Sequence, residues 1–166
     1  MPASEQGVSL ERYMLVPRTL IFLSRQDKVL LLKGAKTKRL WAGLYNGVGG
    51  HIEQGEDILE AAQRELLEET GISPSDLWLC GIVTVDTQTN PGVGIFIFRG
   101  RCPENIPWIT KEGELEWVKL DELLALPVVA DLPGLLPKIL SHTPEQPPFI
   151  AHSRYDEAGK LITTIR

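Results

Sequence analysis

Cysteine is nearly absent from this chain of 166 residues: Cys80 and Cys102 are the only two, and their spacing matches neither a CxxC motif nor a zinc site. We expect both to be reduced, structural thiols. The chain also lacks any apolar run approaching the ~20 residues that span a bilayer. Its first residues lack the basic start and apolar core of a signal peptide. These absences predict a cytoplasmic protein without a membrane partner.

Clustered positive charge is missing as well, since 17 Lys and Arg face 22 Asp and Glu and the net charge is −5. Binding to a nucleic acid polymer depends on grouped Lys and Arg, so we predict no such partner. One small anionic ligand carried by a metal ion stays compatible with this charge. The chain contains no internal repeat, and its length fits one domain spanning residues 1–166.

The pattern of apolar residues predicts strands on both sides of one long helix. Strands are expected at 18–25, 28–35, 77–87, 92–101 and 114–120, helical segments at 57–70, 121–126 and about 132–141, and a final hairpin turning at Asp156–Gly159. The glycine-rich segment 34–56 is expected to be loop with short strands. This order predicts an α/β fold in which a mixed β-sheet packs between helices.

The helix at 57–70 carries an unusual group of charges. Glu65, Glu68 and Glu69 fall within five residues, and only Arg64 lies beside them. Like charges three and four positions apart repel each other by roughly 0.2–0.5 kcal/mol per pair. At 100° per residue the three carboxylates share one arc of about 100°.

This arc borders the apolar face of the helix instead of lying opposite it. The expected core residues are Ile58, Leu59, Ala62 and Leu66. Ala61 falls inside the acidic arc, where its small side chain would leave room for a bound group. A solvated acidic face is the alternative. Partly buried, unpaired carboxylates are costly, however, and a divalent cation would neutralise them where one arginine cannot. Oxygen ligands of this kind suit Mg²⁺ or Mn²⁺.

The glycines before the helix, Gly49, Gly50 and Gly55, would allow tight turns and a close approach of the backbone to a ligand. At this spacing, residues 50–72 resemble the Nudix box, G-x5-E-x7-R-E-U-x-E-E-x-G-U with U an aliphatic residue, and every constrained position fits. The resemblance implies the Nudix α/β/α sandwich, here with a C-terminal extension at about 142–166 that forms a β-hairpin.

Nudix enzymes hydrolyse nucleoside diphosphates linked to another group, and they use Mg²⁺ or Mn²⁺. Carried over by position, the resemblance implies that Glu68 and Glu69 are the principal metal ligands and that the Gly49 carbonyl is a backbone ligand. Glu65 would be a further ligand or the general base. Arg64 would orient and partly neutralise the glutamates.

The resemblance also implies roles for two more carboxylates. Glu56 would pair with Arg64 from the loop. Family members often draw a metal ligand or base from a loop after the box, and Glu112 in KEGELEW is the first candidate here, with Glu116 second. The alternative for both is an exposed loop charge.

The stretch LYNGVGGHIEQGE resembles the MutT-like 8-oxo-dGTP diphosphatases within the family. This implies that Asn46 reads the base, that Gly50 lets the substrate approach, and that Asp131 contacts the purine edge. Those relatives tend to have two adjacent acids and a nearby tryptophan, whereas Leu132 follows Asp131. The alternatives are a turn residue for Asn46 and a helix N-cap for Asp131.

The expected function is metal-dependent hydrolysis of an oxidised purine nucleoside triphosphate, such as 8-oxo-dGTP, to the monophosphate and pyrophosphate. Within the family, ADP-ribose, a nucleotide sugar or a dinucleoside polyphosphate is the alternative substrate. A non-catalytic nucleotide-binding regulatory protein is the alternative from another class. The expected partner is a small nucleotide, with the protein a monomer or homodimer.

Overall fold

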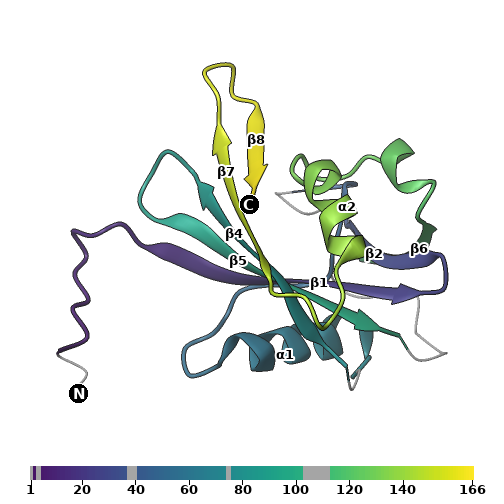
Figure 1. Cartoon of the computed structure of the whole chain (residues 1–166), viewed down its shortest axis with the longest axis horizontal. Helices are drawn as coiled ribbons and strands as arrows, with labels where there is room; N and C mark the ends of the chain where they lie inside the picture. Colours follow the sequence, from purple (N-terminus) through teal and green to yellow (C-terminus); the bar gives the residue numbers. More distant parts are fainter. Residues whose placement is uncertain (1, 3–4, 37–40, 74–75, 103–112) are drawn as a thin grey trace.

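The structure is a computed structural model that describes residues 2, 5–36, 41–73, 76–102 and 113–166 (Figure 1). The elements, in chain order, are β1 (Leu15–Arg25), β2 (Lys28–Gly34), β3 (Tyr45–Asn46), α1 (Ile58–Thr70), β4 (Trp78–Asp86), β5 (Gly92–Arg101), β6 (Gly113–Lys119), the 3-10 helix η2 (Leu123–Ala125), α2 (Leu132–Ser141), β7 (Phe149–Tyr155) and β8 (Leu161–Ile165).

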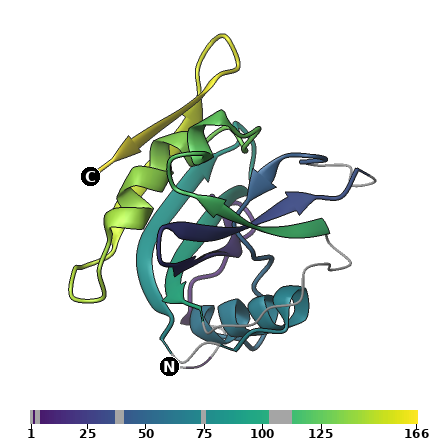
Figure 2. The same cartoon turned by 90° about the vertical axis from the view of Figure 1, so that its right-hand side faces the viewer.

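The strands form one mixed sheet in the order β3-β2-β1-β5-β4-β7-β8, and β6 pairs with β2. The long central pair, β1 and β5, is parallel, as is β4 with β7, whereas the hairpin-connected neighbours are antiparallel. Figures 1 and 2 show that α1 and α2 lie on opposite sides of this curled sheet. The predicted mixed sheet between helices is therefore confirmed.

Alternating side chains of β1 and β2 build two cores, one beneath each helix. Ile21 and Leu23 pack with Ala62 and Leu66 of α1. Phe22, between them in the strand, packs in the other core with the apolar residues of α2. Successive strand residues point to opposite faces of a sheet, so two helices on opposite faces require apolar residues at consecutive positions. The run LIFL in β1 satisfies this requirement.

The predicted elements are all present within the described residues, with small differences at their ends. The α2 helix covers residues 132–141 as expected, and β1 begins three residues earlier than expected, at Leu15. The expected helical segment at 121–126 is reduced to the three-residue η2. Cys80 and Cys102 are not joined in a disulfide. None of the described helices is both long and apolar enough to cross a membrane.

Burial along α1 corrects part of the helical-wheel prediction. Leu59 was expected in the core but is exposed: it lies in the first turn of α1, whereas Ala62, Leu66 and Thr70, further along the same side of the helix, are buried. Ala61 is completely buried and does not line the cavity described below. The room expected beside it is therefore filled by protein.

The last strands extend the same sheet. β7 pairs in parallel with β4, and β8 pairs with β7 after a turn in which the amides of Ala158 and Lys160 bond to the Asp156 carboxylate. This is the predicted C-terminal hairpin, and Gly159 takes the left-handed conformation (φ 75°) that the turn requires. The hairpin projects beyond the helices in Figure 1.

Helix α1 begins at a capping box. The Asp57 carboxylate accepts hydrogen bonds from the amides of Leu59 and Glu60, and the Glu60 side chain accepts one from the Asp57 amide. The helix ends at Gly71, which is left-handed and donates its amide to the Leu67 carbonyl. These two ends fix where the acidic residues of the helix lie.

We predict that Asp57→Ala lowers the free energy of unfolding by about 1 kcal/mol, because two amides at the helix start lose their acceptor. Urea unfolding followed by circular dichroism measures this difference. Asp57→Asn is the matched control and should retain most of the stability, since its side-chain oxygen still caps the helix. Equal stability of Asp57→Ala and the unmodified protein would contradict the role of the cap.

Candidate active site

A loop between β3 and α1 lies along the edge of β1. Its backbone pairs with the strand through Ile21 N to Val48 O (2.6 Å), Thr19 N to Gly50 O (2.9 Å) and Ile52 N to Pro17 O (3.1 Å). A side chain at Gly49, where φ is 150°, would collide with the Thr19 carbonyl. A side chain at Gly50 would occupy the position of the Glu65 carboxylate. Gly49 therefore allows the loop to pair closely with β1, and Gly50 allows α1 to bring the Glu65 carboxylate against the loop.

Arg64 is the centre of the ion pairs at this site. Its Nε and Nη2 donate to both oxygens of Glu56 (2.5 and 3.0 Å), and its Nη1 donates to Glu65 (2.8 Å) and Glu68 (3.4 Å). Nη2 also donates to the His51 carbonyl (3.0 Å). The guanidinium and the Glu53 amide hold the pKa of Glu56 down, at about 2. The acceptors in turn raise the pKa of Arg64, so the fork stays charged.

The three glutamates of the box are not equivalent. The Glu69 side chain is nearly buried (7% exposed) and accepts a hydrogen bond from the Gly49 amide (3.1 Å). The Glu65 side chain is 15% exposed, and that of Glu68 is 61% exposed. The sequence predicted partial burial of all three, which is wrong for Glu68: it lies toward Arg64, on the outer side of the helix.

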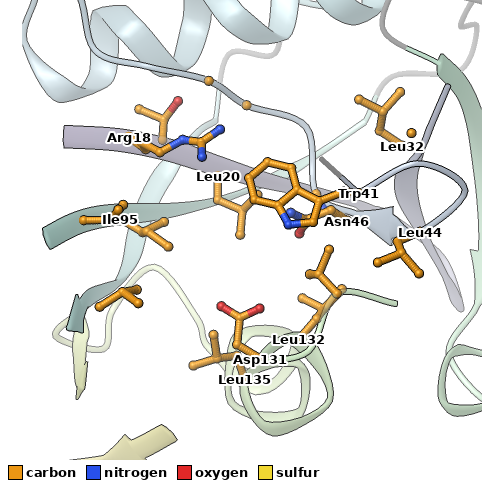
Figure 3. A pocket seen from close by; sticks show the side chains of 18 of the residues that line it. Arg18, Leu20, Leu32, Trp41, Leu44, Asn46, Ile95, Asp131, Leu132 and Leu135 are labelled. Carbon is orange, nitrogen blue, oxygen red and sulfur yellow. The ribbon is translucent and has the colours of Figure 1, made fainter. Parts of the chain in front are cut away.

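One cavity of about 500 Å³ adjoins this cluster. Glu65, Glu69, Gly49 and Gly50 line one part of it, and Glu68 does not line it. Asn46 and Asp131 line it as well, so the structure brings the predicted base-reading residues and two of the predicted metal-binding carboxylates to one space. Figure 3 shows Asp131 pointing into this space from α2.

Backbone pairing brings Asn46 and Asp131 to the same cavity. Tyr45 in β3 donates its amide to the Pro127 carbonyl (2.8 Å) and accepts the Val129 amide (3.1 Å), which holds the segment before α2 against the residue preceding Asn46. Asn46 lies at the end of β3 instead of in a turn, and its Oδ1 accepts the amide of the next residue, Gly47 (2.8 Å).

Asp131 occupies the N-cap position of α2, as the alternative expected, but its side chain makes no capping hydrogen bond. Burial raises the pKa of this carboxyl group, partly opposed by nearby backbone amides. A carboxyl group that holds its proton to higher pH can donate a hydrogen bond as well as accept one. Its position suits a polar ligand edge.

Further lining residues were not predicted from the sequence. Arg18 and Thr19 contribute from β1, and Tyr155 and Leu161 contribute from the C-terminal hairpin. The buried Thr19 Oγ1 has no hydrogen-bond partner within the described part of the chain. A charged residue in the apolar strand β1 was the one available signal for Arg18, whereas nothing in the sequence related the hairpin to the cavity.

Glu112 and Glu116 are the two candidates for a base after the Nudix box. Glu112 lies outside the described residues. Glu116, in β6, accepts a hydrogen bond from the Tyr45 hydroxyl (2.5 Å), which raises the pKa of Tyr45 to about 12. Glu116 does not line the cavity.

The donor set at the cavity fits a hard divalent cation. Among the described residues, no three Asp, Glu, His or Cys side chains already converge on one point. Mg²⁺ does not require such a cage, because one or two carboxylates, waters and substrate phosphates complete its octahedron. Glu65 and Glu69 supply two carboxylates, and Gly50 leaves the space in which that of Glu65 lies.

Comparisons with known proteins identify the family of this chain. The model of the NUDIX domain matches residues 14–139. The oxidized purine nucleoside triphosphate hydrolase of Mus musculus is 27% identical over 146 residues, which cover 87% of this chain and 90% of that protein. The protein of the same name from Danio rerio is 33% identical over 106 residues, covering 63% and 67% of the two chains.

Solved structures show the same architecture. The MutT protein from Bacillus halodurans superposes with a TM-score of 0.72 at 29% identity, over 92% of this chain and 97% of that one. The MutT protein from Methanosarcina mazei Go1 has a TM-score of 0.64 at 24% identity, over 79% and 96% of the two chains, and shows the fold alone. Since the domain model covers most of the sequence, from Met14 to Ile139, the chain belongs to the Nudix hydrolase family.

Proposed function

We propose that this enzyme hydrolyses an oxidised purine nucleoside triphosphate, such as 8-oxo-dGTP, to the monophosphate and pyrophosphate with the help of Mg²⁺ or Mn²⁺. The observation that carries the proposal is the single cavity lined by Glu65 and Glu69 on one side and by Asn46 and Asp131 on the other. A nucleotide has the matching division into a polyphosphate and a base. Two relatives named as oxidized purine nucleoside triphosphate hydrolases support the same substrate.

We assign Glu65 and Glu69, which line the cavity, as metal ligands, together with the Gly49 carbonyl. Bound there, a divalent ion would neutralise polyphosphate charge and lower the pKa of an attacking water. The Gly49 amide holds one oxygen of Glu69, and Arg64 holds Glu65, so neither carboxylate has to be ordered when substrate arrives. The chain thereby keeps both ligands oriented toward the phosphates.

Glu68 and Glu112 have their roles from the resemblance alone. The Glu68 carboxylate is directed to Arg64 on the exposed side of α1, so it would contribute to the metal site only after leaving that contact. Glu112 is proposed as a further ligand and as the base that takes the proton of the attacking water. A base in this role must lie within hydrogen-bond reach of the water.

Asn46 and Asp131 are the groups that we assign to the purine. Oxidation at C8 turns N7 from an acceptor into a donor and adds a carbonyl oxygen, which changes the hydrogen-bonding edge of guanine. Asp131 lies at the start of α2 and lines the cavity, where its carboxyl group can accept a hydrogen bond from a purine N–H. A site built around hydrogen bonds rejects a ligand that leaves its buried polar groups unpaired.

The substrate proposal predicts that kcat/KM for 8-oxo-dGTP exceeds that for dGTP by about 10-fold or more, since one mismatched hydrogen bond to a charged group costs at least this factor. The panel includes dGTP, 8-oxo-dGDP, ADP-ribose, a nucleotide sugar and a dinucleoside polyphosphate, each with Mg²⁺ and with Mn²⁺. Chelation by EDTA should abolish turnover of all of them.

The panel separates the alternatives. Higher kcat/KM for ADP-ribose or for a dinucleoside polyphosphate than for 8-oxo-dGTP would overturn the substrate and leave the metal site standing. Preference for 8-oxo-dGDP would move the substrate from the triphosphate to the diphosphate. Absence of turnover for every compound would favour the non-catalytic alternative.

A second prediction ranks the carboxylates of α1 by their burial at the cavity. Glu69→Gln and Glu65→Gln should lower kcat by about 100-fold or more, because each loses a charged metal ligand worth several kcal/mol of charge stabilisation. Glu68→Gln should lower kcat less than either. Glu122→Gln, an exposed change outside the cavity, is the control. Glu68→Gln as the most damaging change would contradict the assignment.

The assignment of Asp131 predicts a loss that depends on the base. Asp131→Ala should lower kcat/KM for 8-oxo-dGTP by about 10-fold or more and change turnover of a pyrimidine nucleoside triphosphate little. Stability should change little, because no helix cap is lost. Asp121→Ala, exposed and outside the cavity, is the control. Equal losses for purine and pyrimidine substrates would show that Asp131 does not read the base.

A further inference from the structure

Arg18 is a half-buried cation in the wall of the cavity. It lies in β1, paired in register with Ile95 of β5 on one side and bridged to His51 of the loop on the other, and all three residues line the cavity. Within the described part of the chain its guanidinium donates no hydrogen bond and makes no ion pair. Burial lowers the pKa of Arg18, and the negative charge of Glu65 opposes that effect.

Such a group calls for an acceptor. A guanidinium carries five N–H donors and stays charged in proteins, and a buried charge is costly unless it is paired. Water in the cavity can meet this need in part. A ligand that displaces the water has to supply acceptor atoms to the guanidinium, and an anion would also compensate the charge of Arg18.

The indole of Trp41 holds the guanidinium in place. The Arg18 Cζ lies 5.0 Å from the centroid of the Trp41 ring, within the range of a cation–π contact, and Figure 3 shows the two side chains next to each other. The backbone of Trp41 is anchored in turn: its carbonyl accepts the Leu44 amide (3.0 Å), and Gly43 donates to Gly34 of β2 (2.8 Å). Arg18 therefore faces the cavity from a fixed platform.

The other cations near the site are already engaged. Arg64 donates to Glu56, Glu65, Glu68 and the His51 carbonyl, so its fork has no remaining capacity for a ligand. Lys33 lies over the ring of Tyr45 and does not line the cavity. Of the lysines and arginines that the structure describes, Arg18 is the one that lines the cavity, and His51 lines it as well.

The position of Arg18 indicates which part of a bound nucleotide it would contact. The negative charge of Glu65 acts on Arg18. Trp41, whose ring lies against Arg18, lines the cavity together with Asn46. The group that joins the metal-bound part of a nucleotide to its nucleoside is the phosphate attached directly to the sugar. A cation at this position neutralises that phosphate without occupying a metal coordination site.

We propose that Arg18, positioned by Trp41, binds the phosphate attached directly to the nucleoside, the one that the monophosphate product retains. This assignment rests on the proposed function in taking the ligand to be a nucleotide, but it holds for any base. The guanidinium fork matches two oxygens of a phosphate. Arg18 is thus a binding residue, and Trp41 is a positioning residue that acts through it.

The test compares the affinity for a nucleoside monophosphate with the affinity for the same nucleoside, so that the contribution of the base cancels. Calorimetric titrations with 8-oxo-dGMP, dGMP and AMP and with their nucleosides, all with Mg²⁺ present, give this ratio for each base. In Arg18→Gln the ratio should fall by about 10-fold or more, the usual loss for a charge-assisted hydrogen bond. Nucleoside affinity should stay unchanged, which also shows that the cavity remains folded.

Three further variants make the test specific. Arg18→Lys keeps the charge and loses the fork, and its ratio should lie between those of the unmodified protein and Arg18→Gln. Trp41→Leu should lower the ratio, whereas Trp41→Phe, which keeps an aromatic face, should restore most of it. Arg12→Gln, an exposed change outside the cavity, should leave the ratio unchanged.

A fall of less than about fivefold in Arg18→Gln would overturn the assignment, since a direct charged contact is worth more than this. So would an unmodified protein that binds monophosphates no better than nucleosides. Failure of the substrate proposal alone would give a different result. The ratio of monophosphate to nucleoside affinity would still fall in Arg18→Gln for every base that binds, but 8-oxo-dGMP would not be the monophosphate that binds most tightly.

Discussion

The acidic site depends on one guanidinium group. Arg64 donates from all three of its nitrogens and joins the loop before α1, through Glu56 and the His51 carbonyl, to Glu65 and Glu68 on the helix. Without this cation the carboxylates of α1 would repel each other beside an apolar core. With it, the loop and the helix form one unit, and the charge left over is directed toward the cavity.

The three glutamates of α1 differ in how deeply they are buried. Glu69 and Glu65 are held against the loop, the first by the Gly49 amide and the second in the space left by Gly50. Glu68, one position before Glu69, is open to solvent. Adjacent residues on a helix are 100° apart, so two neighbouring glutamates of one motif meet very different surroundings. The sequence motif does not distinguish these glutamates, but their burial in the structure does.

The cavity combines parts of the chain that are distant in sequence. Strand β1 supplies Arg18 and Thr19, β3 supplies Asn46, the start of α2 supplies Asp131, and the C-terminal hairpin closes one side with Tyr155 and Leu161. The backbone bonds of Tyr45 to Pro127 and Val129 keep two of these parts together. Polar groups with unfulfilled hydrogen-bonding capacity, the Thr19 hydroxyl and the Arg18 guanidinium, face this space or lie in its wall.

Local patterns in the sequence were sufficient for much of this protein. Consecutive apolar residues in β1 and β2, the helical pattern of residues 57–70 and the turn at Asp156–Gly159 each act over a few residues, and each predicted its element correctly. The spacing from Gly50 to Ile72 likewise identified the family, because a loop and one helix contain the whole motif.

Tertiary structure alone decided which of these groups share a space. It placed Leu59 and Glu68 outside the buried surface, left the Asp131 side chain without a role as a cap, and set Arg18 and Trp41 in the same wall as Glu65. The period of a helix or strand gives the direction of a side chain, but not how far the neighbouring layer extends or which distant loop covers it. Those depend on contacts between segments far apart in the chain, which no local pattern encodes.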